Sequence, residues 1–176
     1  MATFTGSDDL RGAHFLDADL SGARFVGADL SGVRMRGVQV SVDGEWSFAQ
    51  TLRHLVLATD AWVGRAVLEL DQPFHPLGLA GPTAADDGLD PGLFTTSAPT
   101  YAEVLDARAG RVATVRDVLS GVTAEELARP RRNPWSPQHP ETTLSCLHVV
   151  LEEEWEHLRY AVRDLDAVQA APPAQV

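Results

Sequence analysis

A five-residue period constrains the first forty residues more than any other feature of this sequence. An apolar residue stands at every fifth position, and a small or β-branched residue stands two places before most of these positions. The apolar positions are Leu10, Phe15, Leu20, Phe25, Leu30, Met35 and Val40. Because this period fits neither a helix of 3.6 residues per turn nor a strand with a period of two, it indicates a repeat fold.

The two quintets 18–22 and 28–32 both read Ala-Asp-Leu-Ser-Gly, and the segment resembles the pentapeptide-repeat family. The resemblance implies a short right-handed, four-sided β-helix over residues 1–40, with the Leu and Phe side chains inside. At four quintets per coil, seven quintets make fewer than two coils, and so short a solenoid cannot easily bury its own ends. We therefore expect a structural cap; a binding role is the alternative.

Residues 41–169 are predicted to form a mainly α-helical domain. Hydrophobic periodicity places its long helices at about residues 45–70, 100–119 and 142–167. The connection over residues 71–99 is rich in Pro, Gly and Asp, and a connection of this length either lines a site or is mobile. The Pro- and Ala-rich tail, residues 170–176, is predicted to be disordered.

Two shorter features separate the second and third long helices. The run Thr-Ala-Glu-Glu at residues 123–126 resembles a capping box for a brief helix. The Pro- and Arg-rich run at residues 129–137 is predicted to break regular structure.

The last helix has one long apolar stripe, which is predicted to be its core side. The stripe consists of Leu144, Leu147, Leu151, Trp155, Leu158, Val162 and Leu165. Glu153 and His157 lie well away from the stripe on a helical wheel, so a site there would have to open at the side of a bundle. His148 and Glu152 lie nearer the stripe and are expected to form a buried hydrogen-bonded pair.

Glu153 and His157 are candidate metal ligands, because residues four apart share one face of a helix. His54, on the first helix, would complete a set of two imidazoles and one carboxylate. This set is typical of catalytic zinc and iron sites that keep an open position for water or substrate. From spacing alone, a solvated or structural role for these three side chains remains the alternative.

Composition excludes several classes of function. The formal net charge is -11, from 25 acidic and 14 basic residues, which argues against nucleic acid and anionic membranes as partners. No segment approaches the ~20 apolar residues of a membrane span, so we expect a cytoplasmic protein. A single cysteine, Cys146, excludes a disulfide within one chain. All basic residues are arginine and isoleucine is absent, which indicates a GC-rich bacterial genome.

Several stretches of the helical region resemble the DinB-like superfamily, and more narrowly its pentapeptide-bearing actinobacterial branch. These stretches are residues 43–47 (Asp-Gly-Glu-Trp-Ser), 52–56 (Leu-Arg-His-Leu-Val), 73–78, 150–157 and 163–165. The resemblance implies an antiparallel four-helix bundle that holds a divalent metal by a histidine of one helix and a His/Glu-x-x-x-His pair of another. Carried over to this chain, the ligands are His54, Glu153 and His157.

Members of this superfamily include mycothiol- and bacillithiol-dependent transferases and maleylpyruvate isomerase. The resemblance therefore implies an enzyme that uses zinc, nickel or iron to activate a low-molecular-weight thiol, such as mycothiol, for transfer or isomerisation on a small molecule. Arg129, Arg131 and Arg132 are candidates to hold an anionic substrate, and Cys146 is not expected to be the nucleophile. The alternatives are a non-catalytic interaction or dimerisation module with a relic metal site, and a metal that serves stability alone.

The chain departs from the superfamily pattern in two places. Relatives usually carry a helix between the repeats and the Asp-Gly-Glu-Trp motif, but here only a few residues separate Val40 from Trp46. One bundle helix is thus missing, and either the solenoid or the second subunit of a homodimer would fill its place. Leu158 also stands where a second consecutive histidine is expected.

Overall fold

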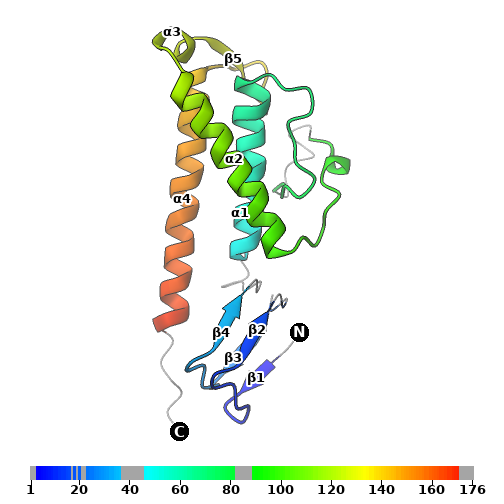
Figure 1. The fold of residues 1–176 in the computed structure, drawn as a ribbon, viewed down its shortest axis with the longest axis vertical. Helices are drawn as coiled ribbons and strands as arrows, with labels where there is room; N and C mark the ends of the chain where they lie inside the picture. Colours follow the sequence, from blue (N-terminus) through cyan, green and yellow to red (C-terminus); the bar gives the residue numbers. More distant parts are fainter. Residues whose placement is uncertain are drawn as a thin grey trace. The chain divides into compact units, whose positions relative to one another are not determined.

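The fold is mainly helical, with four short strands before the helices and two more between them (Figure 1). The computed structural model describes residues 3–16, 18, 20, 23–36, 46–81 and 89–170. The described residues divide into two compact units. One unit draws on residues 1–51, 100–102 and 158–176, and the other on residues 52–99 and 103–157. The predicted tail lies outside the described residues except for Ala170, the last residue of a helix.

The N-terminal strands pair across successive coils of the repeat. They are β1 (Thr3–Thr5), β2 (His14–Leu16), β3 (Arg24–Val26) and β4 (Arg34–Arg36). β1 pairs with β3 and β2 pairs with β4, both in parallel. His14 lies opposite Arg34, which is 20 positions further along the chain. Four quintets therefore make one coil, as the pentapeptide resemblance implies.

The repeat contains a quintet before Leu10, the first apolar position of the five-residue series. Phe4, at the centre of β1, lies opposite Phe25, and its ring meets the ring of Phe15 edge to face at 6.1 Å between centroids. Phe4 precedes Leu10 by six residues rather than five, so it falls out of phase with the later apolar positions. Because of this one extra residue, the five-residue period did not reveal the first quintet.

The first long helix lies at the centre of the helical unit. It comprises α1 (Phe48–Thr59) and a π-helical continuation, η1 (Asp60–Val67). Every residue from 55 to 64 is buried, so this helix is covered on all sides rather than along one stripe. In η1 the amide of Leu68 donates to the carbonyl of Val63, 2.8 Å away, across the wider π-helical turn.

Two further long helices, α2 (Tyr101–Gly121) and α4 (Thr143–Ala170), pack against this central helix. α1 and α2 run in the same direction, because the long segment between them returns along the bundle, and α4 runs opposite to both (Figure 1). The described part of that segment contains a short 3-10 helix, η2 (Pro91–Leu93). The main core cluster joins η1 to α4 and consists of Ala61, Trp62, Val63, Ala66, Val67, Cys146, Leu147 and Val150.

The connection from α2 to α4 holds a short helix and a hairpin. Thr123 caps α3 (Ala124–Leu127) by accepting a hydrogen bond from the amide of Glu126, as the capping-box pattern predicts. The expectation of irregular structure after it is wrong in part, because β5 (Pro130–Arg132) pairs in antiparallel fashion with β6 (Pro140–Thr142).

A buried arginine fastens this hairpin. The side chain of Arg131 is 4% exposed, forms ion pairs with Glu126 and Glu69, and donates to the hydroxyl of Thr143 at 2.9 Å. Arg129 also pairs with Glu126. Because Arg131 is buried and its charge is already matched, the hypothesis that it holds a substrate anion is wrong.

The core side of α4 differs from the prediction. The buried residues of the helix are Thr143, Cys146, Leu147 and Val150. Of the predicted stripe, Leu147 alone is buried among the members whose side chains are described, and the others are 43–60% exposed. His148 and Glu152 are exposed as well, so the expected buried pair is wrong. None of the described helices combines the length and apolar character that a membrane span needs.

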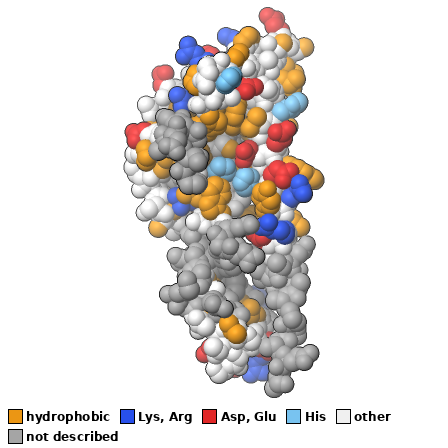
Figure 2. Space-filling model, turned by 180° about the vertical axis from the view of Figure 1, so that it is seen from behind, with side chains coloured by type: hydrophobic (Ala, Val, Ile, Leu, Met, Phe, Trp, Pro, Cys, Tyr) orange, Lys and Arg blue, Asp and Glu red, His pale blue; other side chains and the backbone are white. Residues whose placement is uncertain are grey.

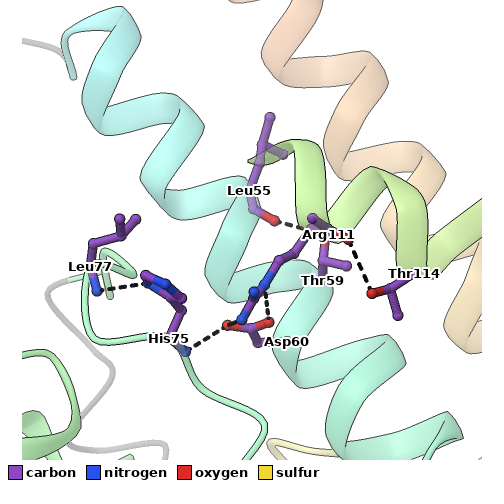
Figure 3. Close-up of polar contacts among 8 residues, drawn as sticks. Leu55, Thr59, Asp60, His75, Leu77, Arg111 and Thr114 are labelled. Atoms are coloured by element: carbon purple, nitrogen blue, oxygen red, sulfur yellow. Dashed lines mark hydrogen bonds and ion pairs between the residues drawn. The ribbon is translucent and has the colours of Figure 1, made fainter. Parts of the chain in front are cut away.

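A buried ion pair joins the central helix to α2 and to the loop (Figure 3). The carboxylate of Asp60 is 6% exposed and accepts hydrogen bonds from Arg111, at 2.7 and 3.1 Å, and from the amide of His75, at 2.8 Å. Burial raises the pKa of Asp60 above its usual value, although the hydrogen bonds from Arg111 and His75 act in the opposite direction. Asp60 therefore depends on these donors to stay charged.

Replacing Arg111 with methionine removes the only side-chain cation that contacts Asp60 among the described residues. We expect Arg111→Met to lower the free energy of unfolding by about 3 kcal/mol, because an uncompensated carboxylate stays buried. Denaturant titration measures the loss, with Arg116→Met, at an exposed position of the same helix, as the control. Adding Asp60→Asn should recover part of the loss. A loss equal to that of the control would contradict this account.

Candidate metal centre

The structure brings together the three side chains that the sequence singled out. His54 lies on α1, and Glu153 and His157 lie on α4, with one ligand atom of each within 4.8 Å of the others. Nε2 of His54 is 3.4 Å from Oε2 of Glu153, and the two imidazole centroids are 5.1 Å apart. All three side chains are partly buried, with exposed fractions of 21% for His54, 33% for Glu153 and 16% for His157.

The position of Glu153 and His157 follows from the true core face of α4. Cys146 and Val150 are buried, and Glu153 and His157 continue the same face at the next three- and four-residue steps. The two ligand candidates therefore point towards α1 rather than to the side of the bundle. The sequence analysis placed Glu153 and His157 away from the core because it took the exposed apolar stripe of α4 for the core side.

Hydrogen bonds fix the tautomer of both imidazoles. Nδ1 of His54 is 3.3 Å from the carbonyl oxygen of Leu79, and Nδ1 of His157 is 2.8 Å from the carbonyl oxygen of Glu153. A carbonyl oxygen only accepts, so each Nδ1 must carry the proton and donate. When the rings are neutral, the lone pair of each therefore lies on Nε2, as a metal ligand requires, whereas a protonated His54 donates from Nε2 to Glu153.

Arg53 holds the loop that orients His54. Its guanidinium donates to the carbonyl oxygens of Leu77 at 2.8 Å, Thr96 at 3.0 Å and Ser97 at 3.2 Å. The amide of Leu79 donates to the carbonyl of Arg53 at 3.2 Å, while the carbonyl of Leu79 faces His54. Sequence reasoning missed this role of Arg53, although the unusual length of the loop was a signal that it lines a site.

The electrostatics of the site favour an ionised carboxylate. The hydrogen bond with His54 holds the pKa of Glu153 below its usual value, with the charges of both histidines acting in the same direction and burial opposing them. The neighbouring Glu154 accepts from Arg108 on α2 at 2.5 Å, which fastens α4 at this level. Glu153 is thus available as an anionic oxygen ligand.

These three residues fit a divalent ion. In a tetrahedral zinc site with bonds of about 2.0–2.1 Å, neighbouring ligand atoms lie about 3.3 Å apart. The separation between Nε2 of His54 and Oε2 of Glu153, 3.4 Å, is close to that value, and the three ligand atoms as a set lie within 4.8 Å, so a bound ion would draw them together. Two imidazole nitrogens and one carboxylate oxygen suit zinc, nickel or iron, and three ligands leave a position open. On the face drawn in Figure 2, histidine and acidic side chains lie next to one another among hydrophobic ones.

Cys146 has no part in this site. Its side chain is fully buried in the core cluster, and burial raises the pKa of the thiol from 9.0 to about 11. A hollow of about 280 Å³ near the end of η1 is also separate from the site, because its lining comes from Arg65 and residues 70–74, 89–90 and 93.

Because Cys146 is buried, we expect its thiol to be unreactive in the folded protein. In the folded protein at mildly alkaline pH we expect no reaction with a thiol-specific chromogenic reagent, since the protonated thiol is neither nucleophilic nor accessible. One equivalent should react after unfolding in guanidinium. Rapid labelling of the folded protein would contradict both the burial of Cys146 and its exclusion from the chemistry.

Releasing the loop should weaken metal binding without unfolding the protein. We expect Arg53→Met to lower the affinity for added zinc about tenfold, because the Leu79 carbonyl no longer fixes the ring of His54. Competition with a chromogenic chelator measures the affinity, and circular dichroism checks the helices. Arg65→Met, an exposed change on η1, is the control and should leave affinity unchanged. Equal zinc affinities in the two variants would show that Arg53 does not orient His54.

Comparison with known proteins agrees with the two resemblances seen in the sequence. Residues 35–161 match the family model of the DinB superfamily. Residues 2–37 match pentapeptide repeats in eight copies, and the match begins before Leu10, the first apolar position of the five-residue series. No curated protein and no solved structure gave a match.

Proposed function

The chain belongs to the DinB superfamily, and on that premise we propose that it is a divalent-metal-dependent enzyme that activates an external low-molecular-weight thiol. The thiol is of the mycothiol type, and the reaction is its transfer to a small molecule or a thiol-assisted isomerisation. The observation that carries the proposal is the meeting of His54, Glu153 and His157 within 4.8 Å. The cytoplasm, where such thiols stay reduced, is the proposed location.

His54 and His157 would hold the ion through Nε2, and Glu153 through a carboxylate oxygen. When bound, a zinc, nickel or iron ion supplies Lewis acidity that lowers the pKa of a thiol at its open position. The Leu79 carbonyl keeps the ring of His54 in place, and the negative charge of Glu153 offsets part of the charge of the ion. The partial exposure of all three side chains leaves the site open to a small molecule.

The identity of the nucleophile follows from the position of the single cysteine. Cys146 is the only thiol of the chain, and its side chain is fully buried. A thiol that reacts at the site must therefore come from outside the protein. This requirement supports a thiol cosubstrate rather than a cysteine-based mechanism.

The second candidate function is a non-catalytic interaction module that keeps the metal residues as a relic. One specific observation favours it, namely the exposure of large apolar side chains along α4. A third candidate, a metal that only stabilises the fold, predicts a fall in melting temperature on chelation without any thiol chemistry.

Metal content tests the site directly. We expect about one zinc, nickel or iron per chain in protein purified without chelators or a histidine tag. His54→Ala and the double variant Glu153→Ala/His157→Ala should each lose the metal, because two or fewer ligands remain. His148→Ala, an exposed histidine of the same helix, should keep it. Parent protein that stays free of metal even after reconstitution would overturn the proposal.

A thiol assay then separates the enzyme from its alternatives. Parent protein loaded with metal should consume mycothiol in the presence of an electrophilic small molecule, and the variants that lose the metal should not. Metal-loaded protein that shows raised thermal stability but consumes no thiol with any electrophile tested would favour the stabilising role.

A further inference from the structure

α4 carries an exposed apolar face of unusual regularity. Its members and their exposed fractions are Leu144 (43%), Leu151 (54%), Trp155 (60%), Leu158 (54%) and Val162 (47%). The steps between them are seven, four, three and four residues, and His148 fills the remaining position of the series. These are the a and d positions of a heptad repeat. The face lies away from the buried residues Cys146 and Val150 of the same helix.

The spacing specifies what kind of element covers this face. A heptad series of large apolar side chains is the seam along which one helix packs against another, each side chain entering a hole on the facing helix. Five large apolar side chains in one row, interrupted at His148, exceed the scattered apolar residues that soluble monomers expose. A helix is therefore the fitting occupant.

We propose that the occupant is α4 of a second copy of this chain, packed antiparallel about a two-fold axis near Trp155. The proposal does not depend on the proposed function, because the seam and the metal candidates lie on different faces of α4. An isologous contact of this kind closes at the dimer and leaves no further surface to recruit more copies.

The charges beside the seam favour the antiparallel arrangement. Glu152 and Arg159 both occupy the e position of the heptad, three residues before and four after Trp155. In an antiparallel pair, e positions face e positions, so Glu152 of each copy meets Arg159 of the other, and the contact occurs twice. In a parallel pair, e positions face g positions instead, so Glu152 would meet Leu147, and Arg159 would meet Glu154, which already pairs with Arg108.

The same two-fold axis also arranges the apolar side chains. Trp155 and Val162 occupy a positions, and Leu151 and Leu158 occupy d positions. In an antiparallel pair a positions face d positions, so Trp155 of each copy packs against Leu158 of the other near the centre, and Leu151 packs against Val162. The centre of an interface is where a buried tryptophan contributes most to affinity.

Mass in solution tests the interface. Sedimentation velocity of the parent should give twice the chain mass of 19.0 kDa. Trp155→Glu and Leu151→Glu should each give the single-chain mass with unchanged circular dichroism, since both positions are exposed in one copy. Leu105→Glu, an exposed leucine of α2, is the matched control and should remain dimeric. A monomeric parent, or a dimer that survives Trp155→Glu, would overturn the proposal.

Charge exchange tests the orientation. Glu152→Arg and Arg159→Glu, made separately, each place two like-charged contacts in the antiparallel dimer and should weaken it about tenfold or more. An equimolar mixture of the two variants should recover the parental affinity, because the mixed dimer pairs arginine with glutamate at both contacts. A mixture no tighter than either variant alone would rule out the antiparallel arrangement.

Discussion

The polar groups of the central helix are the constraint on which the helical unit depends. Every residue from 55 to 64 of α1 and η1 is buried, and so is Arg53, so each polar side chain in this stretch must find a partner within the protein. Asp60 is matched by Arg111 and by the amide of His75, and Thr59 donates to the carbonyl of Leu55. Among the described residues, no buried side-chain nitrogen or oxygen lacks a partner.

The same constraint builds the candidate site. A buried guanidinium needs several acceptors, and Arg53 finds three of them in loop carbonyls that helices cannot offer. The loop is thereby held against α1, and the Leu79 carbonyl comes within reach of His54. The long loop thus supplies the acceptors that a buried guanidinium on the central helix needs. Hydrogen bonds therefore connect the loop both to Arg53 and to the candidate metal ligand His54.

Features with a local cause could be predicted from the sequence. The three long helices, the cap at Thr123 and the five-residue repeat all depend on neighbours in the chain, and all are present in the structure. The pairing of Glu153 with His157 is likewise a local consequence of helix geometry. His54 was a candidate third partner because it is a lone histidine on an earlier helix, and the family resemblance supported that choice.

Features with a tertiary cause could not be predicted. The π-helical turn begins at Asp60, whose partners lie on α2 and in the loop. The hydrophobic periodicity of the helix does not indicate these distant partners. The roles of Arg53 and Arg131 depend on the same kind of distant acceptor. The core side of α4 was misassigned because the helix has two apolar faces, and the face that is exposed is the longer and more apolar one.

The presence of two apolar faces on α4 has a structural consequence. A helix that is apolar on two faces is expected to be covered on both, and in the described residues the chain supplies cover for one of them, through η1 and α2. The family resemblance also led to the expectation that one bundle helix is missing before the Asp-Gly-Glu-Trp motif. Among the described residues, the heptad seam of α4 has a deficit of cover, because its large apolar side chains are 43–60% exposed. A second α4 meets that deficit without any added residue, and leaves the inner face, with Glu153 and His157, unchanged.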